Sequence, residues 1–282
     1  MLKSDDLAQN LVDAAMEVIY SVLGLPKSIS WPHQLQHRMR DLINQQQTIA
    51  WGFGSVEQFL AKKVGLQDLF NEVQDLWTQN PQMNTFLEAL KEKSGSPSFN
   101  STAELIQLFH AATETISSMV MWLMYCLLKY KNQRLYLQNK DDQDSKILFI
   151  KEALRLYPSI PFVTRICTRD THFSGVSYKA GDTIILSLIG LHSHPAYWSH
   201  AQEFDPQRAE FRDKNFDKRA YIPFLSGARS CVGMRLAHQE LLVALKIMLE
   251  HIEFADFNEP LKMSYGLTSK PANILGHYLS LR

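Results

Sequence analysis

Cysteine is scarce in this sequence, and its three copies are Cys126, Cys167 and Cys231. No two of them form a Cys-x-x-Cys pair, which argues against a structural zinc motif and against a dense disulfide framework. So few thiols favour a reducing compartment. Cys231 differs from the other two because it stands among glycines, in the stretch PFLSGARSCVG at residues 223–233.

An excess of charge of either sign is also missing, because 29 Lys and Arg balance 29 Asp and Glu. We therefore expect neither nucleic acid nor an anionic lipid surface as a partner. The longest apolar run, residues 119–128, has only ten residues, which is too short for a bilayer and typical of a buried helix. The N-terminus lacks a signal-peptide pattern. These absences predict a protein with no membrane span and a cytoplasmic location.

The first part of the chain is predicted to be helical. Apolar residues recur at helical spacing in Leu7–Leu23, Leu35–Ile49 and Phe70–Trp77. A longer helix is expected over residues 103–130, amphipathic at first and apolar on all sides later, so its second half should cross the interior. Ser101 and Glu104 fit a capping box that opens this helix.

The second part mixes helices with short strands. A helix over residues 146–157 should end before Pro158, and residues 165–191 carry the alternation and glycine turns of short strands. An apolar stripe from Met234 to Met248 predicts another helix, and the tail at residues 265–282 a turn and a final strand. The expected fold class is α+β: mainly α with small β-sheets.

The stretch around Cys231 suits a thiolate ligand. A thiol binds metal as the thiolate, and the amide groups and dipole at the start of the helix after Gly233 favour a negative sulfur. Gly227 suits a left-handed turn, and Gly233 allows a flat group to approach the backbone. Arg229 can reach an anion at the edge of such a group, and Phe224 can supply an apolar wall.

These residues match the pattern FxxGxRxCxG at Phe224, Gly227, Arg229, Cys231 and Gly233. The sequence thereby resembles the cytochrome P-450 family, the haem-thiolate monooxygenases. The resemblance implies a P-450-like fold with haem b (iron protoporphyrin IX) as cofactor, Cys231 as the iron ligand, and the other four residues as part of the haem site. The alternative interpretation is that Cys231 is a buried apolar cysteine beside a turn.

Three further segments follow the order of this family. In KEALRLYP, Glu152 and Arg155 lie on one helix face, and FDPQR supplies Arg208. The resemblance implies a buried structural network of these three residues beneath the cysteine loop. The alternative is a surface ion pair. Arg165, in PFVTR, is implied to bind a haem propionate, and its alternative is a strand-edge surface arginine.

The long helix contains HAATETI, residues 110–116. The resemblance places Ala111 and Ala112 at small positions that leave a groove for dioxygen. It makes Glu114 and Thr115 the catalytic proton-delivery pair. The alternative is that the Thr115 hydroxyl bonds back to the preceding helical turn.

We expect a single domain over residues 1–282, with a weakly matching region at 1–93 and a haem-binding core at 94–282. We also expect that the family's N-terminal portion is missing from it. The implied function is insertion of one oxygen atom from O₂ into a small apolar substrate. Electrons would come from an external ferredoxin or flavoprotein reductase, because no nucleotide fingerprint or iron–sulfur cysteine set is present.

Two other functions stay open at this point. One is a degenerate or truncated haem binder without turnover, and the other is a helical interaction protein that binds no haem. His110, Cys126 and Cys167 are candidate extra ligands, and each is interpreted as an ordinary packed residue.

Overall fold

The structure is a computed structural model, and it describes residues 4–25, 38, 56–140, 142–266, 268–272, 274 and 279–281, the side chains of 4–9, 56–64, 66, 279 and 281 excepted. The chain divides into two compact units. The C-terminal unit holds residues 1–4, 118–264 and 268–282, and the N-terminal unit holds residues 5–117 and 265–267. The division falls inside one helix, α5. The expectation of a single domain stays a prediction.

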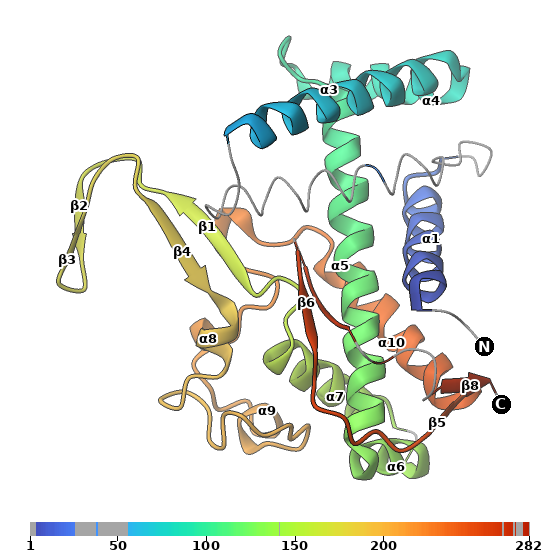
Figure 1. Cartoon of the computed structure of the whole chain (residues 1–282), viewed down its shortest axis with the longest axis vertical. Helices are drawn as coiled ribbons and strands as arrows, with labels where there is room; N and C mark the ends of the chain where they lie inside the picture. The colour runs from blue at the N-terminus through green and yellow to red at the C-terminus, as the bar shows by residue number, and fades with distance from the viewer. Residues whose placement is uncertain are drawn as a thin grey trace. The chain divides into compact units, whose positions relative to one another are not determined.

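Helices make up most of the described chain (Figure 1). In chain order they are α1 (Ser4–Val22), α3 (Val56–Gln79), α4 (Pro81–Ser94), α5 (Ser101–Lys129), α6 (Lys131–Lys140), α7 (Gln143–Leu156), α8 (Leu188–His192), α9 (Ala209–Arg212) and α10 (Met234–His251). Short 3-10 turns cover Lys218–Ala220 and Gly227–Arg229. The expected helix Leu35–Ile49 lies outside the described residues, Arg38 excepted.

The strands form small two-stranded sheets. They are β1 (Phe162–Ile166), β2 (Thr171–Phe173), β3 (Val176–Tyr178), β4 (Thr183–Ser187), β5 (Ile252–Phe254), β6 (Met263–Tyr265), β7 (Ser269–Pro271) and β8 (Leu279–Leu281). The pairs are β1 with β4, β2 with β3, β5 with β8, and β6 with β7. Mostly helical architecture with small antiparallel sheets confirms the expected fold class.

The β1–β4 ribbon positions Arg165, one of the candidate haem-binding residues. Its antiparallel register places Arg165 opposite Ile184. Figure 1 shows β2 and β3 continuing outward from this ribbon. Between them, Ser174 and Gly175 have φ of 49° and 80°, the left-handed pair that a tight two-residue hairpin turn needs.

Helix α5 begins one residue later than its capping residue. The side chain of Asn100 accepts a hydrogen bond from the Ala103 amide at 3.0 Å, so Asn100 caps this helix. The capping box expected at Ser101 and Glu104 is therefore wrong by one position, since Ser101 already lies within the helix.

Helix α5 contributes to the core of each unit. In the N-terminal unit the Phe109 ring packs against Tyr20 and Trp77, with centroids 5.2 and 5.9 Å apart. In the C-terminal unit residues 119–128 are buried, as the apolar run predicts. There the hydroxyl of Ser118 and the indole N–H of Trp122 donate to the Ser269 carbonyl at 2.7 and 2.9 Å.

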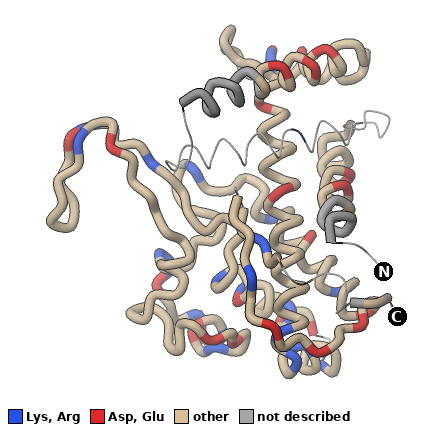
Figure 2. The backbone as a smooth tube through the Cα atoms, in the orientation of Figure 1, with Lys and Arg blue, Asp and Glu red and all other residues tan. Residues whose placement is uncertain are grey.

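Among the described helices, α5 alone is long and apolar enough to cross a membrane when judged by length and composition. In its most apolar window 78% of the residues are buried within the structure, and the core helix of a soluble protein passes the same test. Acidic and basic residues are mixed along most of the described backbone rather than gathered by sign (Figure 2). The cytoplasmic location stays a prediction.

Candidate functional site

The loop that carries Cys231 is closed by its own backbone. The Leu225 amide donates to the Ile222 carbonyl and the Cys231 amide to the Phe224 carbonyl, both at 2.9 Å. Gly227 adopts a φ of 70°, as its place in the pattern predicts, and opens the 3-10 turn that ends at Arg229. Helix α10 then starts just after Gly233, which provides no side-chain cap for the first amides. The loop therefore places a thiol immediately before a helix N-terminus.

The three cysteines differ sharply in exposure. Cys126 is fully buried in α5, and burial raises the pKa of its thiol well above the usual value. Cys167 is half-buried, and its thiol donates to the Arg169 carbonyl at 3.1 Å. Cys231 is exposed, and its neighbour Val232 is 94% exposed. The buried-cysteine interpretation of Cys231 therefore does not describe this structure.

Gly233 keeps the space beside this sulfur open. A Cβ atom built at Gly233 would lie 3.9 Å from Cys231 Sγ, so any side chain there would start in contact with the sulfur. Arg229 is exposed on the same loop, and Phe224 is half-buried with its ring 4.9 Å from that of His238 on α10. Burial, and then the nearby Lys151 charge, lower the pKa of His238.

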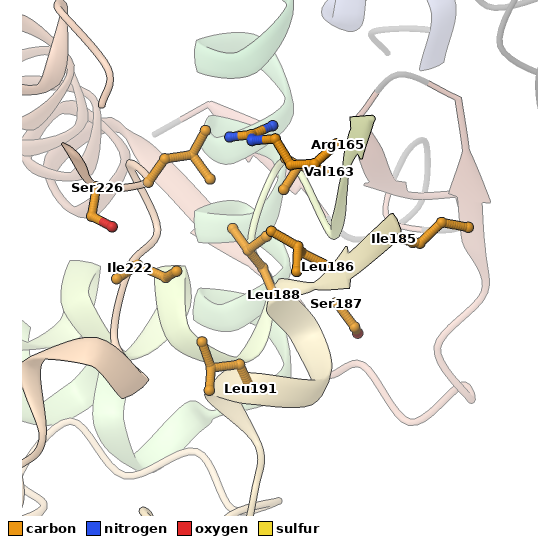
Figure 3. A pocket seen from close by; sticks show the side chains of 10 residues that line it. Val163, Arg165, Ile185, Leu186, Ser187, Leu188, Leu191, Ile222 and Ser226 are labelled. Atoms are coloured by element: carbon orange, nitrogen blue, oxygen red, sulfur yellow. The ribbon is translucent and has the colours of Figure 1, made fainter. Parts of the chain in front are cut away.

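A pocket of about 480 Å³ lies beside the loop in the C-terminal unit. Its wall is mostly aliphatic and comes from β1, β4, α8 and the start of the cysteine loop; the lining residues are Val163, Arg165, Ile185, Leu186, Ser187, Leu188, Leu191, Ile222, Leu225 and Ser226. Figure 3 shows the Arg165 guanidinium above the apolar side chains of Leu186 and Leu188. The pocket thus combines one cation with apolar walls.

Leu225 holds an unusual place in this pocket wall. Its φ is 59°, in the left-handed region that costs a residue with a Cβ atom about 1–2 kcal/mol. Nothing in its side-chain chemistry predicts this conformation, and sequence reasoning missed it. Arg165 is exposed, and Nη1 donates to the carbonyl of its own neighbour Thr164 at 2.8 Å.

Glu152, Arg155 and Arg208 lie together in a buried ionic network, with side chains 0%, 0% and 2% exposed. Arg155 binds the carboxylate of Glu152 through Nε and Nη2 at 2.8 and 2.9 Å. Arg208 binds the same carboxylate through Nε and Nη2 at 3.0 and 2.9 Å. The surface-pair alternative is therefore wrong for these residues.

The two arginines also donate hydrogen bonds to the backbone of the segment between α8 and α9. Arg155 Nη1 donates to the carbonyls of His192 and Ala201 at 2.8 and 2.7 Å. Both arginines donate to the Glu203 carbonyl at 3.0 Å. The Trp198 ring packs against both cations, 5.3 and 5.7 Å from their centres. Because the network is buried and surrounded by backbone, its role is structural.

His192 links this network to the cysteine loop, and sequence reasoning missed it because LHSH carries no recognisable pattern. Its side chain is fully buried, and Nε2 accepts a hydrogen bond from the Ile222 amide at 3.0 Å. Burial and then the Arg155 charge lower the pKa of His192 to about 4. The neutral imidazole therefore helps to position residue 222, where the cysteine loop begins.

The residues of HAATETI belong to the N-terminal unit. Ala111 is exposed, Ala112 and Thr115 are half-buried, and Glu114 is 4% exposed. The Thr115 hydroxyl donates to the Ala111 carbonyl at 2.8 Å, which is the contact that the structural alternative predicts. His110 is buried, in keeping with a packed residue.

The donor set of the C-terminal unit fits a haem group. The described residues contain no cluster of three or more His, Cys, Asp or Glu side chains able to hold a metal. A metal bound through Cys231 must therefore bring most of its own ligands, as porphyrin iron does. The aliphatic pocket with Arg165 suits the apolar ring edge and carboxylates of such a group.

Comparison with known proteins points the same way. The family model of cytochrome P450 matches residues 148–275. This range contains Glu152, Arg155, Arg165, Arg208 and the cysteine loop, but not residues 111–115. Human cytochrome P450 4X1 (Homo sapiens) is 32% identical over 216 residues, covering 68% of this chain and 42% of the relative. Mouse cytochrome P450 3A16 (Mus musculus) is 30% identical, covering 60% and 38%. The chain thus spans about two fifths of the length of these relatives.

The fold has a counterpart among solved structures. The heme domain of a cytochrome P450DA mutant superposes with a TM-score of 0.70 at 21% identity, covering 88% of this chain and 60% of that one. At this identity the likeness concerns the fold alone.

Replacing Arg208 by Leu should destabilise the full chain by about 3–5 kcal/mol, because the buried Glu152 charge loses one of its two arginine partners. Urea unfolding followed by circular dichroism measures the effect. Arg212→Leu is the control, since Arg212 is exposed and should change stability by less than about 0.5 kcal/mol. Equal effects of both substitutions would contradict the network's role.

His192 predicts a loss of stability in acid. Its pKa is about 4 in the folded chain and 6.5 when unperturbed, so between these values the unfolded chain binds more protons. The contribution of the neutral imidazole to the free energy of unfolding is complete above pH 6.5. It falls by about 3 kcal/mol towards pH 4.

The comparison of the parent chain with His192→Gln isolates this effect from other titrating groups. The difference between their unfolding free energies should shrink as pH falls from 7 to 4. His172→Gln is the control, since His172 is exposed on β2. A difference that stays constant with pH would show that His192 does not titrate in this way.

Proposed function

Because the chain belongs to the cytochrome P450 family, we propose that it binds haem b through Cys231 and acts as a monooxygenase on a small apolar substrate. The observation that carries the proposal is the exposed thiol of Cys231 on a glycine-cornered loop before α10. The amides and dipole at this helix start favour the thiolate form, and Gly233 leaves its approach open.

Arg165 binds and orients the group in this proposal. Its guanidinium forms a charge-assisted pair with a porphyrin carboxylate, while the aliphatic pocket wall accepts the ring edge. Arg229 offers a second cation from the cysteine loop, and the Phe224 ring of the same loop packs against His238 of α10. The network of Glu152, Arg155 and Arg208 holds the supporting segments and touches no reacting atom.

When bound, the haem supplies activation of dioxygen with electrons from an external donor, so that one oxygen atom enters the substrate and the other leaves as water. As the family resemblance implies, the small side chains of Ala111 and Ala112 would leave room for dioxygen on the face of α5. The Thr115 hydroxyl would donate a proton towards the dioxygen, and the Glu114 carboxylate would relay a proton from solvent to replace it. For this task the Thr115 hydroxyl turns away from the Ala111 carbonyl that it contacts in the structure. The donor is a ferredoxin or a flavoprotein reductase.

A second candidate is haem binding without turnover. The back-bonded Thr115 hydroxyl favours it, because a hydroxyl committed to the Ala111 carbonyl has no proton to give elsewhere. Both candidate functions use Cys231 as the haem ligand. They differ in whether Thr115 and Glu114 of α5 deliver protons.

Cys231→Ala should abolish thiolate-ligated haem. The parent chain, loaded with haemin, reduced and treated with carbon monoxide, is expected to show a strongly red-shifted Soret band that requires thiolate ligation. The variant should lose this band entirely. Cys167→Ala is the matched control and should keep it, since Cys167 is committed to the Arg169 carbonyl. A band that survives in Cys231→Ala would eliminate the assigned ligand.

Thr115→Ala separates the two candidate functions. With a reductase pair and an alkoxycoumarin as probe substrate, the variant should form roughly tenfold or more less product per electron pair consumed, with more hydrogen peroxide released. Thr115→Ser keeps the hydroxyl and should behave as the parent. Haem uptake with no product from the parent itself would favour binding without turnover, and unchanged coupling in Thr115→Ala would remove Thr115 from the proton route.

A further inference from the structure

Leu225 stands apart from the other described residues that adopt a positive φ without being glycine. The others are Ser174, His200 and Lys214, which are exposed and polar. Leu225 has an apolar side chain, is half-buried, and lines the Arg165 pocket. An unfavourable backbone conformation persists where the surrounding structure holds it, and such outliers gather at ligand sites.

The backbone on both sides of Leu225 is fixed. Its own amide donates to the Ile222 carbonyl at 2.9 Å, and the preceding Phe224 carbonyl accepts from the Cys231 amide at 2.9 Å. The residue cannot leave the left-handed region without opening the cysteine loop. Glycine would adopt the same backbone at no steric cost. What distinguishes leucine at this position is therefore its side chain in the pocket.

The pocket chemistry shows what that side chain can do. The Arg165 guanidinium and the Ser226 hydroxyl are polar, and Leu186, Ile222 and Leu225 contribute aliphatic surface. A carboxylate that pairs with Arg165 here has hydrocarbon on its flank instead of water. The pair becomes stronger as the local dielectric falls.

We propose that Leu225 is a positioning residue for the porphyrin: its side chain excludes water from the pair between Arg165 and a porphyrin carboxylate. This inference rests on the proposed function, because it concerns the same haem site. Truncating the side chain lowers haem affinity. The same change relieves the left-handed strain, which offsets the packing that is lost, so stability stays nearly constant.

The test compares the full chain with Leu225→Gly and with Lys214→Gly, a matched change at an exposed residue whose φ is 54°. Haem affinity is measured by titration with haemin followed at the Soret band, and stability by thermal unfolding without haem. Leu225→Gly should weaken haem binding about tenfold, because water that reaches the pair between Arg165 and the porphyrin carboxylate weakens that pair. Its unfolding midpoint should stay within about 2 °C of the parent. Lys214→Gly should leave haem affinity unchanged.

Two further variants show that the effect acts through Arg165. Leu225→Met, which keeps a long apolar side chain, should restore affinity to within about twofold of the parent. In an Arg165→Gln background, Leu225→Gly should cost less than about threefold, because the ion pair that it protects is gone.

The outcomes separate this inference from the function on which it rests. A parent chain that takes up no haemin overturns both. A parent that shows Cys231-dependent binding, together with a Leu225→Gly variant that binds equally tightly, overturns the role of Leu225 alone. An undiminished tenfold loss in the Arg165→Gln background, or a loss of stability in proportion to the loss of affinity, also contradicts it.

Discussion

The buried carboxylate of Glu152 is the interaction on which the described C-terminal unit most depends. Two arginines bind it with paired hydrogen bonds, and the Asp205 amide adds another at 2.9 Å. Desolvating these charges is costly, and the cost is met only because almost every donor finds a partner. Those partners are backbone carbonyls of residues 192–203, a stretch with little regular hydrogen bonding of its own. Side chains thus fix this stretch where helices or sheets would otherwise do so.

The cysteine loop depends on this network through His192. The His192 carbonyl accepts a hydrogen bond from Arg155, and the His192 ring nitrogen Nε2 accepts one from the Ile222 amide. Residue 222 opens the turn that carries Leu225, and the same loop ends at Cys231. An exposed thiol needs this support, because a loop that carries a ligand has few packing contacts of its own. The residues that make the site rigid are therefore distinct from those that contact a bound group.

The site itself uses a simple division of chemistry. In the proposed haem site the Cys231 sulfur would supply the metal ligand, and Arg165 supplies a cation within a pocket lined mostly by aliphatic side chains. Glycine serves a different purpose at two positions: Gly227 adopts a φ of 70°, and Gly233 leaves the space beside the sulfur free of a side chain. Leu225 has a similar left-handed backbone, with a φ of 59°, although it is not glycine. Its side chain lines the Arg165 pocket.

Local patterns predicted a large part of the molecule. The stripes of α1 and α10, the end of α7 before Pro158 and the turn at Gly227 depend on spacing within a few residues, and all were found. Helix α6 was not predicted, because its sequence KNQRLYLQNK is mostly polar. It buries Arg134 through a 2.6 Å hydrogen bond to the Leu127 carbonyl, a contact that composition does not show. The link between Glu152 and Arg208, 56 residues apart, was inferred from family resemblance and not from spacing.

The sequence by itself therefore determined the cysteine loop, since its residues act through neighbours in the chain and through the start of one helix. Tertiary structure alone decided that Cys231 is exposed while Cys126 is buried, that His192 joins the network to the loop, and that Arg165 shares a pocket with Leu225. The physical reason is that burial and long-range hydrogen bonds depend on which segments meet. Local propensity does not determine which segments of the chain pack together.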